Sequence, residues 1–285
     1  MKLVLKKQES FINERIQVLC KDVPCLDAAW HYHPQYELLY ISKSNGIRFV
    51  GDNVSRFTPG DLVLVGSNLP HLWRNDASYY KEDSTNNVKT IVIKFMKDFI
   101  GKETFSYPEF SIINQMLENS KYGLFFSEKV SKELHDDLLE IIDLSPAEQS
   151  IKLLNLLHRL AKIENKAVLS STDMRQYATE PSKRLDAVIK HISDNYAGHI
   201  TLQDVADIAC MTTNSFCRFF KKMTNKSFTQ FLNEVRVRNA TRLLLEDNLS
   251  VSEVCYMVGY NSITNFYNQF KQILGSTPKN YRQTL

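Results

Sequence analysis

The C-terminal third of this chain contains the same helix-turn-helix pattern twice. The first copy covers residues 201–231 and the second covers residues 250–281. Their apolar positions correspond at an offset of 49 or 50 residues, and the corresponding pairs are Val205 and Val254, Ala206 and Cys255, Met211 and Tyr260, Phe216 and Phe266, and Phe220 and Phe270. The repeat predicts two similar helical units, and such a pair on one scaffold can occupy successive grooves of duplex DNA.

Each copy carries signals for the limits of its first helix. Thr201 with Asp204, and Ser250 with Glu253, place a hydroxyl at the N-cap and a carboxylate three residues later, the pattern of a capping box. Gly259 follows the first helix of the second copy, where a sharp exit requires a positive φ. A short first helix that supports a second helix is therefore expected in each copy.

The second helices are expected at residues 213–223 and 263–274, with a long helix over residues 229–246 between the copies. About 18 residues of helix span about 27 Å. That length is close to the ~34 Å between adjacent major-groove faces, so one chain can read two consecutive turns. The phenylalanines that mark the buried faces are Phe216, Phe219, Phe220, Phe266 and Phe270.

The remaining positions of the second helices are expected to face DNA. Arg can bind guanine edges, Asn can bind adenine, and Ile or Thr methyl groups can pack on thymine. The residues predicted to read bases are Thr213, Asn214, Cys217, Arg218, Ile263, Thr264, Tyr267 and Asn268. Those predicted to bind phosphates, which supply affinity without sequence information, are Lys221, Lys222, Lys226, Lys271 and Arg282. For any one of these side chains, a solvated helix face is the alternative.

Charge is distributed unevenly along the chain. Residues 182–285 hold 13 basic and 8 acidic residues, a formal charge of +5, whereas the rest of the chain carries −2. The region with the repeat is therefore the basic one, which favours a polyanionic partner.

Residues 10–100 show the short apolar segments of β-strands. The expected strands are residues 38–42, 47–51, 61–66 and 88–95, which are rich in β-branched and aromatic residues and are separated by turn signals. From Pro108 onward the apolar period becomes helical, and Ser145-Pro146 is expected to start the last helix of this region.

These patterns predict an α+β chain with an N-terminal β-barrel, trailing helices and an all-helical C-terminal domain. The expected divisions are a barrel over residues 1–107, a helical packing or dimerisation region over 108–164, a polar linker over 165–182 and the DNA-binding domain over 183–285.

Three motifs near the C-terminus carry a family resemblance. They are Val254-Cys255-x-x-Val258-Gly259-Tyr260, Phe266-x3-Phe270-Lys271 and Gly275-x-Thr277-Pro278-x2-Tyr281-Arg282. Over roughly 100 residues the chain resembles the AraC/XylS family of bacterial transcription regulators. The resemblance implies base-facing roles for the predicted reading residues, except Thr213, and RNA polymerase as a partner. The chain departs from the family at Cys255, usually alanine, and at Asn268, arginine in some members, so the second unit is expected to read DNA differently or more weakly.

The predicted barrel contains a second set of polar residues. His31-x-His33-x3-Glu37, Pro59-Gly60-Asp61 and His71-x3-Asn75 resemble the two cupin motifs. In a metal-binding cupin, His31, His33, Glu37 and His71 would be ligands for Mn, Fe, Ni or Zn. The favoured interpretation is a structural or effector-contacting role without a metal or other cofactor. The residues expected around a small polar effector such as a sugar are Trp30, His31, His33, Glu37, His71 and Trp73.

These observations favour a transcription regulator rather than an enzyme. The expected partners are double-stranded DNA, RNA polymerase, an effector and a second copy of the chain. Activation is the expected mode, with repression left open. The alternatives are a metal-dependent cupin enzyme fused to a DNA-binding tail, and a constitutive DNA-bending or interaction module that needs no effector. A cytoplasmic location without membrane contact is expected, because the N-terminus lacks a secretory apolar segment and no apolar run reaches ~18 residues. The five cysteines contain no Cys-x-x-Cys pair and are expected to be reduced, mostly as small core residues.

Overall fold

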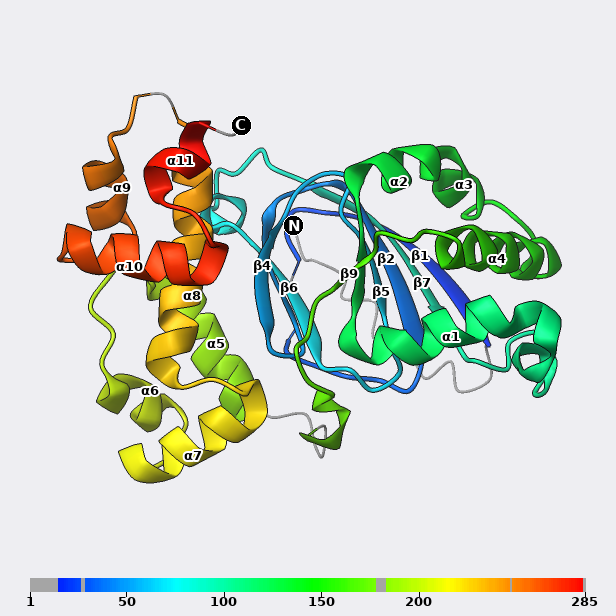
Figure 1. Ribbon diagram of the computed structural model, residues 1–285, viewed down its shortest axis with the longest axis horizontal. Coiled ribbons are helices and arrows are strands. Elements are labelled where there is room, and N and C mark those ends of the chain that lie inside the picture. The colour runs from blue at the N-terminus through cyan, green and yellow to red at the C-terminus, as the bar shows by residue number, and fades with distance from the viewer. Residues whose placement is uncertain (1–14, 27–28, 178–182, 247, 284–285) are drawn as a thin grey trace.

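The computed structural model describes residues 15–26, 29–177, 183–246 and 248–283. A strand-rich N-terminal part lies beside an entirely helical C-terminal part (Figure 1). The helices α1–α4 lie on the side of the strands that is far from the C-terminal part. The expected α+β architecture, with strands first and the paired helical units last, is confirmed.

Two sheets form the N-terminal barrel. The larger sheet has the order β1-β7-β2-β5-β8-β9 and the smaller sheet has the order β4-β3-β6. The strands of the larger sheet are β1 (Ile16–Val23), β7 (Val88–Phe95), β2 (Tyr36–Lys43), β5 (Leu62–Val65), β8 (Leu124–Phe126) and β9 (Ala167–Val168). Those of the smaller sheet are β4 (Asn53–Phe57), β3 (Gly46–Val50) and β6 (His71–Asn75).

The larger sheet is buried on both faces, which explains its unbroken apolar segments. Along β2, Leu39 and Ile41 join a core shared with the smaller sheet. Leu38 and Tyr40, on the opposite face, pack in a second core with the helices. Because alternate residues of a strand point to opposite faces, both sets must be apolar. The four expected strands correspond to β2, β3, β5 and β7.

Short helices cover the outer face of the larger sheet. Leu153, Leu156, Leu157 and Leu160 of the longest of them are fully buried against it. That helix begins as predicted, with Ser145 as the N-cap before Pro146 and Glu148 completing the capping box. The helices are α1 (Ser111–Asn119), α2 (Glu128–Glu133), α3 (His135–Glu140) and α4 (Pro146–Ala161).

The stretch expected as a linker, residues 165–182, begins with ordered structure. Strand β9 pairs with β8, and Met174 is fully buried in the barrel core. Ser170 is also buried and accepts a hydrogen bond from the backbone N–H of Asp52 at 3.2 Å. Residues 165–177 therefore belong to the barrel, and residues 178–182 lie outside the described part of the chain.

The C-terminal part contains two helix-turn-helix units on either side of one long helix, α8 (Figure 1). The first unit uses α6 and α7, and the second uses α9 and α10. Both predicted capping boxes are present, at Thr201 with Asp204 and at Ser250 with Glu253. The helices are α5 (Lys183–Asn195), α6 (Leu202–Ile208), α7 (Thr213–Thr224), α8 (Phe228–Leu243), α9 (Val251–Met257), α10 (Ile263–Leu274) and α11 (Pro278–Gln283).

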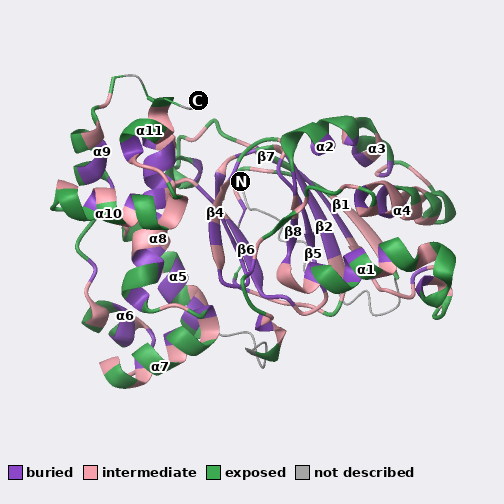
Figure 2. Ribbon diagram, viewed as in Figure 1, coloured by how far each residue is buried: buried purple, intermediate pink, exposed green. Residues whose placement is uncertain are grey.

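The helical part rests on the outer face of the smaller barrel sheet. Phe49 of β3 stacks on Phe231 of α8 with ring centroids 5.6 Å apart. Arg238 of α8 donates through Nε to the carbonyl oxygen of Val54 at 2.8 Å. Helix α8 is accordingly buried along much of its length (Figure 2). The smaller sheet thus separates the barrel interior from the C-terminal part.

Only Cys255 of the five cysteines is buried, so the expectation that most of them fill the core is wrong. Among the described residues, no helix is long and apolar enough to span a membrane.

Candidate nucleic-acid interface and barrel site

Helix α7 presents a polar face to solvent. Its N-cap Thr212 accepts a hydrogen bond from the backbone N–H of Ser215 at 3.3 Å. Phe216 and Phe220 are fully buried, which fixes the rotation of the helix. The predicted reading residues Asn214, Cys217 and Arg218 are exposed, and Thr213 is half-buried. Three of the four side chains are therefore free to approach a ligand.

Helix α10 is arranged in the same way but offers a smaller polar face. Ser262 caps it through the backbone N–H of Asn265 at 3.4 Å. Thr264 and Asn268 are exposed, whereas Ile263 and Tyr267 are half-buried against the core of their own unit. Of the four side chains predicted to read bases from this helix, two are thus fully exposed.

The five predicted phosphate contacts are in two different situations. Lys221, Lys222 and Lys271 are exposed. Lys226 instead forms an ion pair with Glu234, and Arg282 donates through Nε to the carbonyl oxygen of Leu244 at 2.9 Å. Both cations are therefore engaged inside the protein, Lys226 with a residue of α8 and Arg282 with the residue that ends it.

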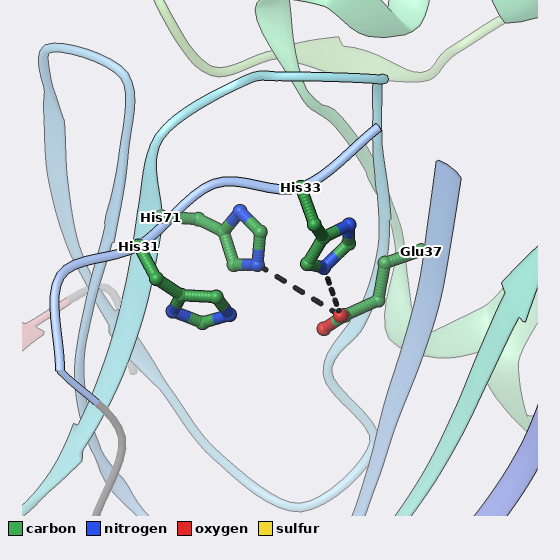
Figure 3. Close-up of side chains that lie close together, drawn as sticks. All are labelled: His31, His33, Glu37 and His71. Carbon is green, nitrogen blue, oxygen red and sulfur yellow. Dashed lines mark hydrogen bonds and ion pairs between the residues drawn. The ribbon is translucent and has the colours of Figure 1, made fainter. Parts of the chain in front are cut away.

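Three histidines and one glutamate converge inside the barrel (Figure 3). Nε2 of His33 lies 3.0 Å from Oε2 of Glu37, and Nε2 of His71 lies 3.8 Å from the same oxygen. The His31 and His71 rings are 4.3 Å apart between centroids. One candidate ligand atom from each of His31, His33, Glu37 and His71 lies within 4.8 Å of the others. The sequence motifs therefore do bring these four residues together.

Each histidine of the cluster has its other ring nitrogen occupied. Nδ1 of His31 lies 2.8 Å from the carbonyl oxygen of Ala29, and Nδ1 of His71 lies 2.8 Å from that of Leu69. Nδ1 of His33 is 3.1 Å from the carbonyl oxygen of Gln35. A carbonyl oxygen only accepts, so the tautomer that forms these hydrogen bonds carries its hydrogen on Nδ1. In His33 the two nitrogens compete, because Nε2 faces the Glu37 carboxylate at 3.0 Å. In a neutral His31 ring with its hydrogen on Nδ1, Nε2 offers a lone pair toward the cluster.

Burial controls the charges of the cluster. It lowers the pKa of His31 to about 3, and the neighbouring His71 adds to the effect. Burial also lowers the pKa of His33. For Glu37, burial opposes ionisation, but the imidazoles of His33 and His71 bring the carboxyl pKa well below its ordinary value. At neutral pH the site therefore combines neutral His31 and His33 with an ionised carboxylate, a set of electron-pair donors that suits a divalent metal.

A cavity of about 370 Å³ opens beside the cluster. Its lining includes His31, Glu37, His71 and Trp73 from the predicted effector site. Trp30 is not part of this lining. It is buried in an apolar cluster that combines smaller-sheet residues with the helices of the C-terminal part. The structure thus places Trp73 at the cavity and Trp30 at the contact between the two parts of the chain.

Several residues of the cavity were missed by sequence reasoning. Lys21, Thr90 and Lys94 line it, and Nζ of Lys94 lies 3.4 Å from Oε2 of Glu37. Lys94 alternates with apolar residues in β7, so a strict period-2 reading of that strand gives it the inward face of the cavity. No pattern in the sequence predicted the contacts between the barrel and the C-terminal part.

Comparisons with known proteins match both parts of the chain. A family model described as a helix-turn-helix domain covers residues 205–284. YdeC of Bacillus subtilis, an uncharacterized HTH-type transcriptional regulator, is 22% identical over 259 residues, which cover 89% of this chain and 85% of YdeC. The HTH-type transcriptional activator RhaR of Mannheimia succiniciproducens is 24% identical over 265 residues, 88% of this chain and 86% of RhaR. The crystal structure of an apo ToxT variant from Vibrio cholerae covers 96% of this chain and 98% of its own, with 14% identity and a TM-score of 0.38.

Proposed function

We propose that this chain, a transcription regulator of the AraC/XylS type, binds duplex DNA through α7 and α10 and responds to a ligand held in its barrel. The observation that carries the DNA proposal is the placement of two exposed, similarly capped helices on either side of α8. The 16 residues of α8 span about 24 Å, which suits helices in adjacent turns of a major groove.

The side chains divide between base edges and backbone. Asn214 and Arg218 in α7 are proposed to read bases, with Cys217 and Thr213 beside them. In α10 the exposed Thr264 and Asn268 take this role, flanked by Ile263 and Tyr267. Exposed Lys221, Lys222 and Lys271 bind phosphates. Lys226 and Arg282 add positive charge near the phosphates while they keep their contacts inside the protein. A guanidinium can bind guanine through two hydrogen bonds, so Arg218 is the strongest single reader.

Activation of transcription is the proposed outcome of binding. RhaR is named as a transcriptional activator and matches most of this chain. By the same likeness, RNA polymerase is the proposed protein partner, and the cytoplasm is the proposed location. A homodimer is proposed through the helical region, where Ile151 of α4 is 71% exposed and Leu139 of α3 is 41% exposed. Sedimentation of the parent and of Ile151→Glu tests the dimer.

The barrel cavity is the proposed effector site. Glu37, His31 and His71 supply acceptors, Lys21 and Lys94 supply positive charge, and Trp73 supplies an aromatic wall. This lining favours a small polar ligand with an anionic group, such as a sugar acid, over a neutral sugar. A thermal-shift series that pairs each neutral sugar with its acid tests the assignment, and the acids are expected to raise the melting temperature more.

Footprinting tests the DNA proposal directly. The full chain is incubated with DNA from the region upstream of its own gene, and two protected segments about one helical turn apart are expected for each bound chain. A single protected segment shorter than one turn, or no protection, would overturn the proposal. The enzyme alternative is not favoured, because the relatives that match most of this chain are named as regulators.

A further inference from the structure

Helix α8 changes partners halfway along its length. Its first half packs in the core of the first unit, and the last residue of the helix in that core is Val235. Its second half packs in the core of the second unit, beginning at Val237. The two units accordingly lie toward opposite ends of α8 (Figure 1). Arg236 lies at the border, where one side chain can contact both units.

The guanidinium of Arg236 binds the first unit through the segment that leads from α5 into α6. Nε donates to the carbonyl oxygen of Tyr196 and Nη2 donates to that of Gly198, each at 2.8 Å. The segment continues to Thr201, the N-cap of α6, and α6 packs against α7. Because a guanidinium is planar and rigid, two hydrogen bonds from it fix both the position and the direction of this segment.

The same guanidinium contacts the second unit. Cζ of Arg236 lies 5.5 Å from the centroid of the Tyr260 ring, within the range of a cation–π interaction. Tyr260 is buried in the turn between α9 and α10. Its ring packs on that of Phe266, a fully buried residue of α10, with the centroids 5.3 Å apart. Through Tyr260, Arg236 therefore contacts the core that fixes α10.

The backbones of the two units also meet at this place. A Cβ atom on Gly259 would lie 2.7 Å from the carbonyl oxygen of Tyr196 and 2.8 Å from that of Ala197, which is too close for real atoms. The side chain of Tyr196 packs against the cores of both units. The turn of the second unit thus lies directly on the segment after α5, and Arg236 binds both.

We propose that Arg236 is a positioning residue that sets the angle between α7 and α10, and thereby the spacing of the two DNA sites that one chain accepts. The inference deepens the proposed function, on which it rests, by assigning a residue to the recognition of spacing. Apolar packing on α8 is non-directional, whereas hydrogen bonds weaken steeply when they bend. The contacts of Arg236 therefore supply orientation, which the two apolar cores supply less well.

The angle matters because two linked sites bind together only where their geometry matches. One inserted base pair moves the second DNA site by about 3.4 Å and turns it by about 35°. A chain with a fixed angle then loses one of its two contacts. A chain whose units turn relative to each other tolerates the insertion, but it loses more entropy on binding at any spacing.

Arg238 provides a matched control on the same helix. Its Nε also donates to a carbonyl oxygen at 2.8 Å, but that oxygen belongs to Val54 of the barrel. Arg238→Ala therefore removes a similar hydrogen bond and the same charge from α8 and leaves the contact between the units in place. Arg236→Ala is the main variant. Arg236→Lys is the milder one, because it keeps the charge and loses the planar pair of donors.

The first measurement needs no DNA and uses the full chain. One nitroxide label is placed on Cys217, which is exposed on α7, and a second on the cysteine of Asn268→Cys, at an exposed position of α10. Pulsed electron paramagnetic resonance then reports the distribution of distances between the two helices. The three other cysteines that are not buried are replaced by serine, and they are Cys20, Cys25 and Cys210.

The parent is expected to show one narrow distribution of distances. Arg236→Ala should show a distribution at least about twice as wide, because several angles become populated, and Arg238→Ala should match the parent. Circular dichroism checks the helix content of each variant. An unchanged width in a folded Arg236→Ala chain would overturn the proposal, and Arg236→Lys decides in the same way if Arg236→Ala loses helix content.

The second measurement uses the DNA segment that footprinting shows to be protected, with one base pair inserted between its two sites. The insertion is expected to weaken binding of the parent at least about tenfold and of Arg236→Ala less than about threefold. DNA with one site alone should bind both chains equally, since each unit keeps its own helix. Equal losses on the insertion in both chains would contradict the role in spacing, even if the label distances widen.

These measurements distinguish the inference from the proposed function. A chain that protects no DNA overturns the proposed function, and the label distances still show whether Arg236 fixes the angle. A chain that protects two DNA sites, with the same distances and the same spacing loss in Arg236→Ala as in the parent, overturns this inference alone.

Discussion

The two helix-turn-helix units share one pattern but differ in what surrounds them. The core of the first unit continues into the barrel, because its apolar cluster contains Phe49 and Val54 together with Phe220 and Phe231. The cluster of the second unit, built around Phe266 and Phe270, contains no barrel residue among those described. A change in the barrel can therefore reach DNA through the core of the first unit, whereas the core of the second unit packs on α8 and on Tyr196, which follows α5.

The largest effect is expected when one core phenylalanine is removed from each unit in turn. Phe220 and Phe270 are both fully buried, and a Phe→Ala change in a core costs about 3–5 kcal/mol. Phe220→Ala is expected to lower the stability of the first unit and of the barrel contact together, since Phe220 touches Phe231, which stacks on Phe49. Phe270→Ala should instead make the second unit unfold in a separate transition, at a lower urea concentration than the rest of the chain. Urea denaturation monitored by hydrogen exchange measures the stability of each unit in the two variants.

A single shifted transition in Phe270→Ala would contradict the independence of the second unit. So would early exchange of the barrel in that variant.

The next effect separates α7 and α10, the two helices proposed to read bases. Arg218 of α7 is exposed and charged. The corresponding residue of α10, Asn268, is exposed but uncharged. A bidentate pair with a base contributes about 1–3 kcal/mol of discrimination. Arg218→Ala is therefore expected to weaken specific binding about 10- to 100-fold and to relax preference at one position. Asn268→Ala should weaken it by less, about threefold, because no charge is lost. Binding to a randomised operator library measures both, and a larger loss in Asn268→Ala would reverse the ranking.

The sequence predicted the repeat more fully than the barrel. Helix α10 has the predicted bounds of 263–274, and α7 ends one residue beyond its predicted end. Helices follow from local signals such as the caps at Thr201 and Ser250, which need no distant partner. Strands β4 and β6 gave a weaker signal, because Arg56 and Arg74 interrupt their apolar pattern. Both side chains turn to acidic or amide partners outside the barrel core, and no local pattern shows that.

The cluster of the barrel was found from its motif, but its surroundings were not. His31, His33 and Glu37 lie close together in sequence, at and just before the start of β2. His71 lies beside them because it begins β6. Trp30 was grouped with them because it is adjacent in sequence, although it packs against the C-terminal part. The contacts of Trp30 with Asp186 and of Asp52 with Asn225 join residues more than 150 positions apart. Such contacts depend on how two finished domains meet, which local patterns do not encode.

A smaller effect concerns the end of α7. Asn225 caps it in the left-handed conformation, with φ of 57°, and donates to Asp52 of the barrel at 2.9 Å. Gly275 occupies the corresponding position after α10, with φ of 74°. Asn225→Gly therefore keeps a residue suited to that conformation and removes only the contact between domains. A loss of about 1 kcal/mol of stability is expected.

The same variant should change the dependence of stability on pH. Burial opposes ionisation of Asp52, but hydrogen bonds from Ser171, Asn225 and Ser170 outweigh it and lower the carboxyl pKa from 3.8. The stabilisation is therefore complete above that ordinary value and is lost as the pH falls through the lowered pKa. Lys226 and Glu234 line a surface cavity together with Asp52 and Asn225, but they pair with each other. Thermal melts from pH 7 to pH 3 should show a shallower acid loss in Asn225→Gly, and equal losses would show that this contact is not formed in solution.

The smallest effect is one on which the two units should agree. Lys221 of α7 and Lys271 of α10 are corresponding, exposed residues, and both are proposed to bind phosphate. Each phosphate contact contributes about 0.9 to the slope of the logarithm of affinity against the logarithm of salt concentration. Lys221→Ala and Lys271→Ala are expected to reduce that slope by about 0.9 each, uniformly across DNA sequences, and the double variant by about twice as much. Titrations at four salt concentrations measure it. If only Lys221→Ala changes the slope, the second unit does not contact the backbone, and the two units differ in docking as well as in readout.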